Sequence, residues 1–214
     1  MRHEYCYWYF KKVLSEEFCN KVIERGLSLK KKFARVGAGH GGPVYAFDGL
    51  KKPTKKQILK IRNSNVSWLN DQWIYDEIYP YIIKANKNAG WNFKFDWSEN
   101  CQFTIYKKGQ YYDWHYDSFD KPWSNHSSPN FNGKIRKLSV TISLSDPKKY
   151  KGGELQFCDN TERPDKKQKI LTCHEIYEKG SLVVFPSYIW HRVKPVTQGT
   201  RYSLVIWNIG HPYE

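Results

Sequence analysis

The second half of the chain is a series of short β-type segments separated by turns, and this pattern restricts the possible fold most strongly. These segments are rich in β-branched and aromatic residues, and they follow a region with helical patterns. The candidate strands cover residues 93–97, 101–106, 111–117, 137–145, 153–158, 170–177, 181–186 and 200–208. About eight strands after a helical region are typical of a double-sheet jelly roll or a cupin-like barrel. We therefore predict a mainly β fold, with helices packed behind a jelly-roll core.

Two earlier stretches carry apolar residues at helical spacing. Residues 15–29 begin with Ser15, a good N-cap, and have two acidic residues in the first turn. Residues 66–88 show the same periodicity, and Pro80 is expected to kink or divide this helix. Because both helices have apolar faces that need a partner, we expect them to belong to the same domain as the strands. The predicted organisation is a single domain, residues 1–214, with helical support in 1–95 and the β core in 96–210.

Composition excludes several classes of protein. Hydrophobic residues make up 40% of the chain and aromatic residues 17%, which is typical of a folded core and not of a disordered chain. The five cysteines form no C-x-x-C pair and leave one residue over in any disulfide scheme. The first ten residues lack the apolar core of a signal peptide, and no apolar run approaches the length of a membrane span. We therefore expect a reducing cytoplasm and no membrane partner.

The charge is strongly basic, with 35 Lys and Arg against 21 Asp and Glu, a formal net charge of +14. Such a surface attracts anionic partners, for example nucleic acid, a ribonucleoprotein or an acidic protein. However, the lysines occur in short runs spread along the chain, without the interleaved aromatic residues of a nucleic-acid groove. A solvated basic surface is therefore the simpler interpretation.

The candidate strand 111–117 ends in His115-Tyr116-Asp117. Residues two apart in a strand share a face, so His115 and Asp117 can direct an imidazole and a carboxylate to one point. One further ligand would complete a 2-His-1-carboxylate triad, which binds Fe(II) and leaves positions open for other ligands. His191 is the candidate for this third ligand, and His126 is its rival.

Two loops contain the other notable histidines. Residues 118–136 are polar, contain prolines and are too long for a hairpin turn, and their place after two candidate ligands favours a lid. His126 lies in this loop, where an exposed polar role is the simpler explanation. Residues 36–43 contain four glycines but lack the strand, helix and Lys-Ser/Thr of a phosphate-binding loop. We interpret them, with His40, as a surface loop.

After Lys137, the candidate strand 137–145 alternates strictly between apolar and hydroxyl side chains. Its apolar face consists of Leu138, Val140, Ile142 and Leu144, and its hydroxyl face of Ser139, Thr141, Ser143 and Ser145. Hydroxyl groups inside a barrel would suit a small polar ligand, whereas outside they would only form a wetted face. The strand pattern alone leaves both alternatives open.

The last candidate strand carries Arg201, Ser203 and Trp207 on one face by the same alternation. His191 precedes Arg201 by ten residues, which suggests a short return between adjacent antiparallel strands. An arginine inside a barrel is an uncompensated charge unless an anion meets it, and a carboxylate is its usual bidentate partner. A dicarboxylate with one end on iron and the other on Arg201 would explain both parts of the site.

These residues fall within motifs of a known family. Tyr106-x-x-Gly109-Gln110-x-Tyr112-x-x-His115-x-Asp117 resembles the active-site entry of Fe(II)/2-oxoglutarate-dependent dioxygenases of the prolyl 4-hydroxylase type. Four later segments resemble the bacterial PKHD-type branch: Leu144-Ser145-Asp146-Pro147, Gly152-Gly153-Glu154-Leu155, Phe185-Pro186-Ser187 and His191-Arg192-Val193-x-Pro195-Val196-Thr197-x-Gly199-x-Arg201. The resemblance covers about residues 100–208 and implies a double-stranded β-helix core.

The resemblance also implies roles for individual residues. His115, Asp117 and His191 would bind Fe(II) and form the catalytic centre. The residues that would contact the cosubstrate 2-oxoglutarate are Arg201, Tyr106 and Ser143, although prolyl hydroxylases often have a tyrosine where Ser143 falls. The residues that would line the substrate pocket are Tyr112 and Trp207. Simple alternation places Tyr112 opposite His115 unless the strand bulges.

The implied activity is hydroxylation of a prolyl or other residue of a protein or peptide, with O₂ consumed and succinate and CO₂ released. Ascorbate (vitamin C) would be the reductant. Alternatives are a nucleic-acid demethylase, a small-molecule hydroxylase and a non-catalytic binding module. In alkylation-repair enzymes a second arginine usually follows the cosubstrate arginine by six positions, and here that position is Trp207. This difference favours a peptidyl substrate.

Overall fold

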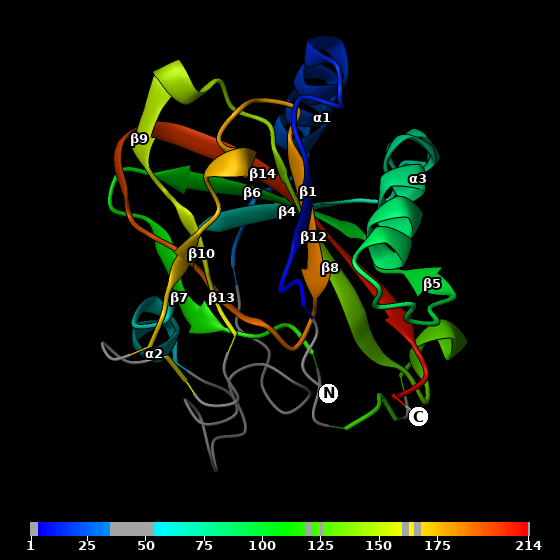
Figure 1. The fold of residues 1–214 in the computed structure, drawn as a ribbon. Coiled ribbons are helices and arrows are strands. Elements are labelled where there is room, and N and C mark those ends of the chain that lie inside the picture. The colour runs from blue at the N-terminus through cyan, green and yellow to red at the C-terminus, as the bar shows by residue number, and fades with distance from the viewer. Residues whose placement is uncertain are drawn as a thin grey trace.

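Two antiparallel sheets face each other, and two long helices lie on the outer side of the larger sheet (Figure 1). The computed structural model describes residues 4–34, 54–118, 121–124, 126–159, 163–164 and 168–213. The glycine-rich stretch 36–43 and His40 therefore lie outside the described residues. The described part confirms the prediction of a mainly β fold with helical support.

The larger sheet has nine strands within the described residues. They are β1 (Trp8–Phe10), β2 (Lys32–Phe33), β4 (Asn65–Leu69), β5 (Trp97–Ser98), β6 (Cys101–Lys107), β8 (Ile135–Ser143), β9 (Tyr150–Gly152), β12 (Leu182–Pro186) and β14 (Val196–Gly210). Their order is β1-β12-β8-β14-β6-β4-β2, and β5 and β9 both pair with β14. The strand that carries Arg201 is thus central to this sheet.

The smaller sheet has five strands in the part of the chain that the structure describes. In spatial order they are β11 (Leu171–Thr172), β10 (Leu155–Cys158), β13 (Trp190–Val193), β7 (Tyr111–His115) and β3 (Arg62–Asn63). The two candidate metal-binding histidines therefore lie on neighbouring strands, and His191 is the register partner of His115.

Helices α1 (Glu16–Ser28) and α3 (Gln72–Asn88) cover the larger sheet, whereas the short α2 (Lys55–Leu59) lies beside β3. Ser15 caps α1 as predicted, because its hydroxyl accepts a hydrogen bond from the Phe18 backbone amide at 3.0 Å. Among the described residues, three short 3-10 helices cover Pro129–Phe131, Pro147–Lys149 and His174–Ile176.

Strand β8 separates the two parts of the core. Its apolar face packs with α1 and α3 in one hydrophobic cluster. Its hydroxyl face points between the sheets, where Ser139 bonds to Asp117 and Thr141 lines a cavity. Of the two alternatives left open by the sequence, the hydroxyl groups of this strand therefore lie inside the barrel, in the space between the sheets.

Several sequence predictions need correction. Residues 65–69 are strand β4 and not the start of a helix, because Val66 and Leu69 are buried where β4 pairs with β6. Helix α3 continues through Pro80 and is not divided. Pro80 and Asp76 are exposed, so water can satisfy the Asp76 carbonyl that has no amide partner.

Other boundaries and one spatial relation also differ. The predicted strands 93–97 and 170–177 reduce to Trp97–Ser98 and Leu171–Thr172, because the segment after Leu171–Thr172 forms a 3-10 helix. β13 and β14 are not adjacent strands of one sheet, as expected from the short return, but belong to opposite sheets. His191 and Arg201 therefore face each other across the space between the sheets.

The region before residue 96 contributes β1, β2, β3 and β4 as well as its helices, so it is part of both sheets and not helical support alone. The extent of the domain, residues 1–214, stays a prediction. Among the described residues, no helix combines the length and apolar character that a membrane crossing requires.

Candidate metal and cosubstrate site

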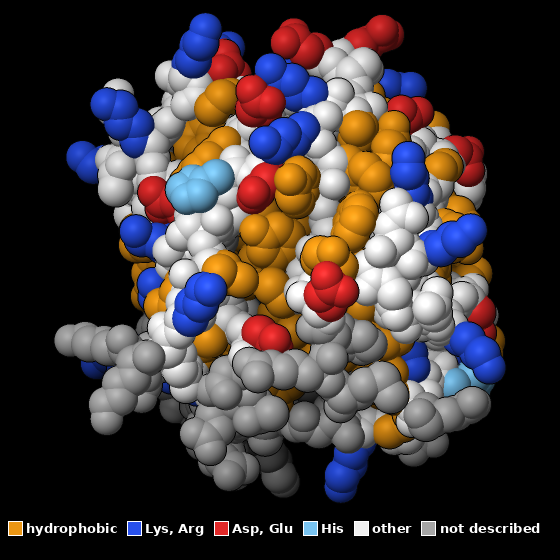
Figure 2. All heavy atoms as spheres, in the orientation of Figure 1, with side chains coloured by type: hydrophobic (Ala, Val, Ile, Leu, Met, Phe, Trp, Pro, Cys, Tyr) orange, Lys and Arg blue, Asp and Glu red, His pale blue; other side chains and the backbone are white. Residues whose placement is uncertain are grey.

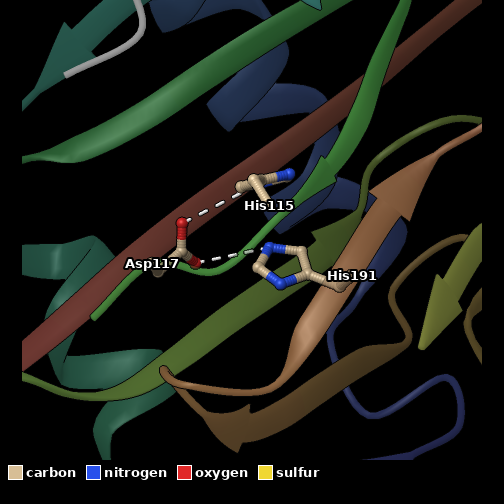
Figure 3. Close-up of side chains that lie close together, drawn as sticks. All are labelled: His115, Asp117 and His191. Carbon is tan, nitrogen blue, oxygen red and sulfur yellow. Dashed lines mark ion pairs between the residues drawn. The ribbon is translucent and has the colours of Figure 1, made fainter. Parts of the chain in front are cut away.

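Three side chains from the two central strands of the smaller sheet converge between the sheets. His115 ends β7, Asp117 follows it by two residues, and His191 lies on β13. One potential ligand atom from each residue lies within 4.8 Å of the others, and all three residues are buried. Figure 3 shows the carboxylate of Asp117 pointing at both imidazoles. The structure thus brings together the three residues that the sequence suggested as metal ligands.

Both imidazoles are oriented by the backbone of their own strands. His115 Nδ1 lies 2.8 Å from the Asp113 carbonyl oxygen, and His191 Nδ1 lies 2.9 Å from the Ile189 carbonyl oxygen. A carbonyl oxygen can only accept, so each Nδ1 carries a hydrogen, and Nε2 is the ring nitrogen that offers a lone pair when the ring is neutral. The Nε2 atoms face Asp117, at 3.8 Å for His115 and 3.4 Å for His191. This is the tautomer that a metal ion needs from both rings.

The protonation states also suit a cation. Burial and the neighbouring His191 hold the pKa of His115 well below its ordinary value, so its ring is neutral near pH 7. Burial acts to raise the pKa of Asp117, but His191, His115 and Arg136 outweigh it and leave the pKa below its usual value. A neutral imidazole and an ionised carboxylate are the forms that ligate a divalent metal.

Tyr112 lies on the same side as His115, contrary to simple alternation. Its ring stacks on the His115 ring, with centroids 3.4 Å apart and an interplanar angle of 11°. The register explains this: His191 pairs with His115 but Val193 pairs with Tyr112, so β7 contains one extra residue over this interval. Such a bulge turns Tyr112 toward the metal cluster.

Arg201 forms the opposite end of the site. Its side chain is 2% exposed, and its Nη1 atom has no hydrogen-bond partner among the described residues. The guanidinium lies 5.7 Å from the centre of the Tyr106 ring. Tyr106 is on β6 and is the register partner of Arg201. A buried guanidinium without full hydrogen bonding is unfavourable unless an anion binds there. A small carboxylate fits this requirement.

Gly153 leaves room for this arginine. A Cβ atom at Gly153 would lie 2.9 Å from Arg201 Cδ, and the residue has a φ of +70°, which favours glycine. The absence of a side chain at Gly153 therefore leaves space for Arg201, whereas a Cβ at Gly152 would meet the Pro195 carbonyl oxygen.

One cavity connects the two ends. Seven of the eight site residues suggested by the sequence line it: Tyr106, Tyr112, His115, Asp117, His191, Arg201 and Trp207. The eighth, Ser143, is buried but does not belong to the lining, and its hydroxyl has no partner among the described residues. Its register partner Ser203 does line the cavity.

Sequence reasoning missed several lining residues, of which Arg62 and Gln102 are the most polar. Arg62 comes from the two-residue strand β3; its guanidinium lies 4.4 Å from the centre of the Tyr112 ring, and its Nε donates to Ser64. A strand of two residues has no periodicity that could reveal it. Gln102 lies on the predicted strand β6, where alternation with Tyr106 was a usable signal.

Trp207 is fixed by a buried ion pair. The Arg136 guanidinium lies 3.8 Å from the centre of the indole ring and is bound by both carboxylate oxygens of Glu99, at 2.6 and 2.7 Å. The Glu99 amide also donates to the Trp207 carbonyl oxygen at 2.8 Å. The ring of Trp68, which is 43% exposed, lies 6.1 Å from Trp207. An aromatic wall thus extends from the cavity toward the surface.

His126 does not join the metal cluster of the described residues. Its ring stacks on Phe131, with centroids 4.3 Å apart, and its Nδ1 accepts a hydrogen bond from the Ser128 amide. The loop 118–136 contains this local structure, but its role as a lid stays a prediction. His191 is therefore the third residue of the cluster, and His126 has a local structural role.

A two-sheet β fold places two histidines, one carboxylate and a buried arginine in one cavity, an arrangement that suits a divalent metal and a small carboxylate. The family model "2OG-Fe(II) oxygenase superfamily" matches residues 101–208, just over half of the 214 residues. The chain belongs to this superfamily, whose cofactor and cosubstrates are Fe(II), 2-oxoglutarate and O₂. This confirms the family that the motifs suggested.

Individual relatives agree with this assignment. A PKHD-type hydroxylase from Janthinobacterium is 33% identical over 106 residues, which are 49% of this chain and 41% of that protein. The chain thus matches about two fifths of the length of this relative. A Pseudomonas putida prolyl-4-hydroxylase (TM-score 0.63, 17% identity) covers 96% of this chain and 93% of its own. A viral collagen prolyl hydroxylase from Paramecium bursaria chlorella virus-1 (TM-score 0.61, 19% identity) covers 97% of both chains. The likeness to these two structures shows the double-stranded β-helix fold.

Proposed function

We propose that this protein is an Fe(II)- and 2-oxoglutarate-dependent hydroxylase that acts on a prolyl or other residue of a protein. The single observation that supports it most is the cavity itself, which combines the cluster of His115, Asp117 and His191 with the buried guanidinium of Arg201. A non-catalytic binding module would gain nothing from keeping a costly unsatisfied arginine next to a complete set of metal ligands.

In this proposal His115 and His191 bind the metal through Nε2, and Asp117 binds it through its carboxylate. When bound, Fe(II) together with 2-oxoglutarate and O₂ supplies the oxidising chemistry, in which the substrate C–H becomes C–OH while succinate and CO₂ are released. Ascorbate is the proposed reductant. A reducing cytoplasm, which is compatible with ferrous iron and with five free cysteines, is the proposed location.

The other residues of the cavity orient the reactants. Arg201, which is buried, would bind the carboxylate of 2-oxoglutarate that lies far from the metal as a bidentate partner. Tyr106 contacts the same molecule from β6, and Ser143 supports it from β8. Tyr112 and Trp207 are the proposed contacts of the residue to be hydroxylated.

A protein substrate is supported by the names of the relatives and by the aromatic wall. The two similar solved structures are named as prolyl hydroxylases, one of them of collagen. The wall of Trp207 and Trp68 reaches the surface and suits an apolar ring on an extended chain. A nucleic-acid demethylase and a small-molecule hydroxylase are the alternatives within the superfamily.

The basic charge supports an acidic protein partner, including one that belongs to a ribonucleoprotein. On the face in Figure 2, lysine and arginine side chains are dispersed and mixed with acidic ones, without a continuous basic groove for nucleic acid. If the partner is acidic, its binding should weaken steeply as salt rises from about 0.05 to 0.3 M. A flat salt response would remove the acidic-partner proposal without affecting the hydroxylase.

The decisive experiment incubates the Fe(II)-loaded enzyme with a peptide library, 2-oxoglutarate and air. We expect succinate release together with a one-oxygen mass gain on the substrate, and tandem mass spectrometry then identifies the modified residue. The matched control is His191→Ala with the same peptides. Succinate release with methylated oligonucleotides but with no peptide would favour the demethylase instead.

A further inference from the structure

Two buried serine hydroxyls form a chain that ends on the carboxylate of Asp117. Ser139 Oγ lies 2.8 Å from Asp117 Oδ2, and Ser187 Oγ lies 2.9 Å from Ser139 Oγ. Both serines have 0% exposure. Ser139 comes from β8 of the larger sheet, and Ser187 follows the end of β12. The metal-binding carboxylate is therefore held by the sheet opposite to the one that carries the histidines.

The direction of the hydrogen bonds in this chain is determined by counting protons. An ionised carboxylate can only accept, so the single hydroxyl proton of Ser139 must point to Asp117. Ser139 then has only lone pairs to offer, and Ser187 must donate to it. The order is Ser187 to Ser139 to Asp117, and every proton in it points toward the carboxylate.

The backbone strengthens the same connection. The Ser187 carbonyl oxygen accepts from the amides of Asp117 and Ser118, at 2.7 and 2.8 Å, and the Ser187 amide donates to the Lys137 carbonyl oxygen at 3.0 Å. Ser187 thus links the segment after β7 to the beginning of β8. Ser187 therefore supports Asp117 in two ways: its hydroxyl bonds to Ser139, and its carbonyl oxygen accepts from the Asp117 amide.

Asp117 needs this support more than the two histidines do. His115 and His191 lie within paired strands, whereas β7 ends at His115 and Asp117 lies two residues beyond. Without strand pairing at its own position, the orientation of Asp117 depends on what its backbone amide and carboxylate contact. The backbone amide donates to the Ser187 carbonyl oxygen, and the carboxylate accepts from Ser139 besides facing the His115 and His191 imidazoles and the Trp207 indole.

We propose that Ser139 and Ser187 are positioning residues that fix the orientation of the Asp117 carboxylate and thereby set the affinity of the site for a divalent metal. Hydrogen-bond partners of metal ligands typically contribute 10- to 100-fold in metal affinity. The inference assumes the metal-ligand roles given under the proposed function, and its test separates the two.

The test measures Mn(II) binding to the metal-free protein by isothermal titration calorimetry, because Mn(II) replaces Fe(II) without oxidising in air. We expect Ser139→Ala to weaken Mn(II) binding about 10- to 100-fold and Ser187→Ala to weaken it less, about 3- to 10-fold. The Co(II) derivative should show an altered visible spectrum in Ser139→Ala, since the carboxylate of Asp117 is free to reorient.

The matched control is Ser67→Ala. Ser67 is also buried, and its hydroxyl donates at 2.7 Å to the Gly26 carbonyl, which is not part of the metal cluster. It should lower the melting temperature while leaving the Mn(II) dissociation constant unchanged. A second pair, Ser139→Thr and Ser139→Val, adds the same bulk and differs in the hydroxyl alone, so Thr should bind Mn(II) more tightly than Val.

The results separate two failures. If the natural sequence binds no Mn(II), the metal-site assignment in the proposed function is wrong, and with it this inference. If the natural sequence binds Mn(II) and Ser139→Ala binds it equally well, or Thr and Val are equal, the positioning role is wrong and the metal site stands. Should Ser139→Ala fail to fold, an unchanged affinity in Ser187→Ala would be enough to overturn the role.

Discussion

The two ends of the cavity differ in how completely the side chains proposed to bind ligands are satisfied by hydrogen bonds from the protein. At the metal end, both histidine Nδ1 atoms bond to carbonyl oxygens and Asp117 accepts from Ser139. At the other end, Arg201 Nη1 and Ser143 Oγ are buried without a hydrogen-bond partner among the described residues.

This difference indicates two ways of preparing a binding site. The metal end is preorganised, since each ligand is oriented by a hydrogen bond that does not involve the metal. The arginine end instead keeps unfavourable buried groups whose cost a bound carboxylate would relieve. Substitutions at the two ends should therefore have different effects on the protein without ligands.

The largest expected effect is that of His191→Ala at the metal end. Loss of one of three protein ligands should abolish 2-oxoglutarate turnover and Mn(II) binding, with succinate production falling at least about 100-fold. The measurement is succinate release and calorimetric Mn(II) titration under controlled metal content. Full succinate production in this variant would show that the ligand assignment is wrong.

The next effect separates the two ends most clearly. Arg201→Met should weaken 2-oxoglutarate binding by about 2–5 kcal/mol, or about 30-fold or more, because the charged partner of the carboxylate is lost. The same substitution should not lower the melting temperature of the ligand-free protein, since it removes a buried charge that lacks full hydrogen bonding.

Thermal shift with and without 2-oxoglutarate measures both quantities in the Arg201→Met variant, and Mn(II) affinity should stay unchanged. A large drop in the melting temperature of the ligand-free variant, with the 2-oxoglutarate response retained, would mean that Arg201 has a structural role instead.

The fold class and the positions of His115, Asp117 and Arg201 were predictable because they depend on local periodicity. Tyr106 and Tyr112 were instead suggested by the family motif alone. Alternation in β8 and β14 separates the faces that line the cavity from the faces that pack outward. Spacing two residues apart places His115 and Asp117 together. Such patterns can be found by counting along the chain.

What the sequence could not reveal depends on long-range contacts. The turn of Tyr112 toward His115 follows from the β7 bulge, which is visible in the register with β13. The support of Asp117 by Ser139 joins residues 22 positions apart on opposite sheets. Arg62 enters the cavity from a strand of two residues that has no pattern of its own.

A smaller effect is expected from Gly153→Ala, again at the arginine end. The new Cβ would lie 2.9 Å from Arg201 Cδ and must displace that side chain, so KM for 2-oxoglutarate should rise about 5- to 10-fold, or about 1–1.4 kcal/mol. Gly90→Ala is the matched control, since Gly90 has the same φ of +70° but nothing within 4 Å of the added Cβ.

Both glycine variants should lose stability from backbone strain, by about 1 kcal/mol, but only Gly153→Ala should change KM. Equal KM values for 2-oxoglutarate in the two variants would show that glycine is needed at position 153 for the turn alone and not to make room for the Arg201 side chain.

The smallest expected effect returns to the metal end, at Tyr112. Its ring stacks on His115, and aromatic pairs of this kind contribute about 0.5–1.5 kcal/mol. Tyr112→Leu should therefore weaken Mn(II) binding about 2- to 10-fold, whereas Tyr112→Phe keeps the ring and should leave Mn(II) binding unchanged. Neither variant should change the shift in melting temperature caused by 2-oxoglutarate by as much as Arg201→Met does.

The contradicting outcome would be that Tyr112→Leu reduces 2-oxoglutarate binding and leaves Mn(II) binding unchanged. The two ends of the cavity would then not be independent, and the division between a preorganised metal end and a ligand-dependent arginine end would be wrong.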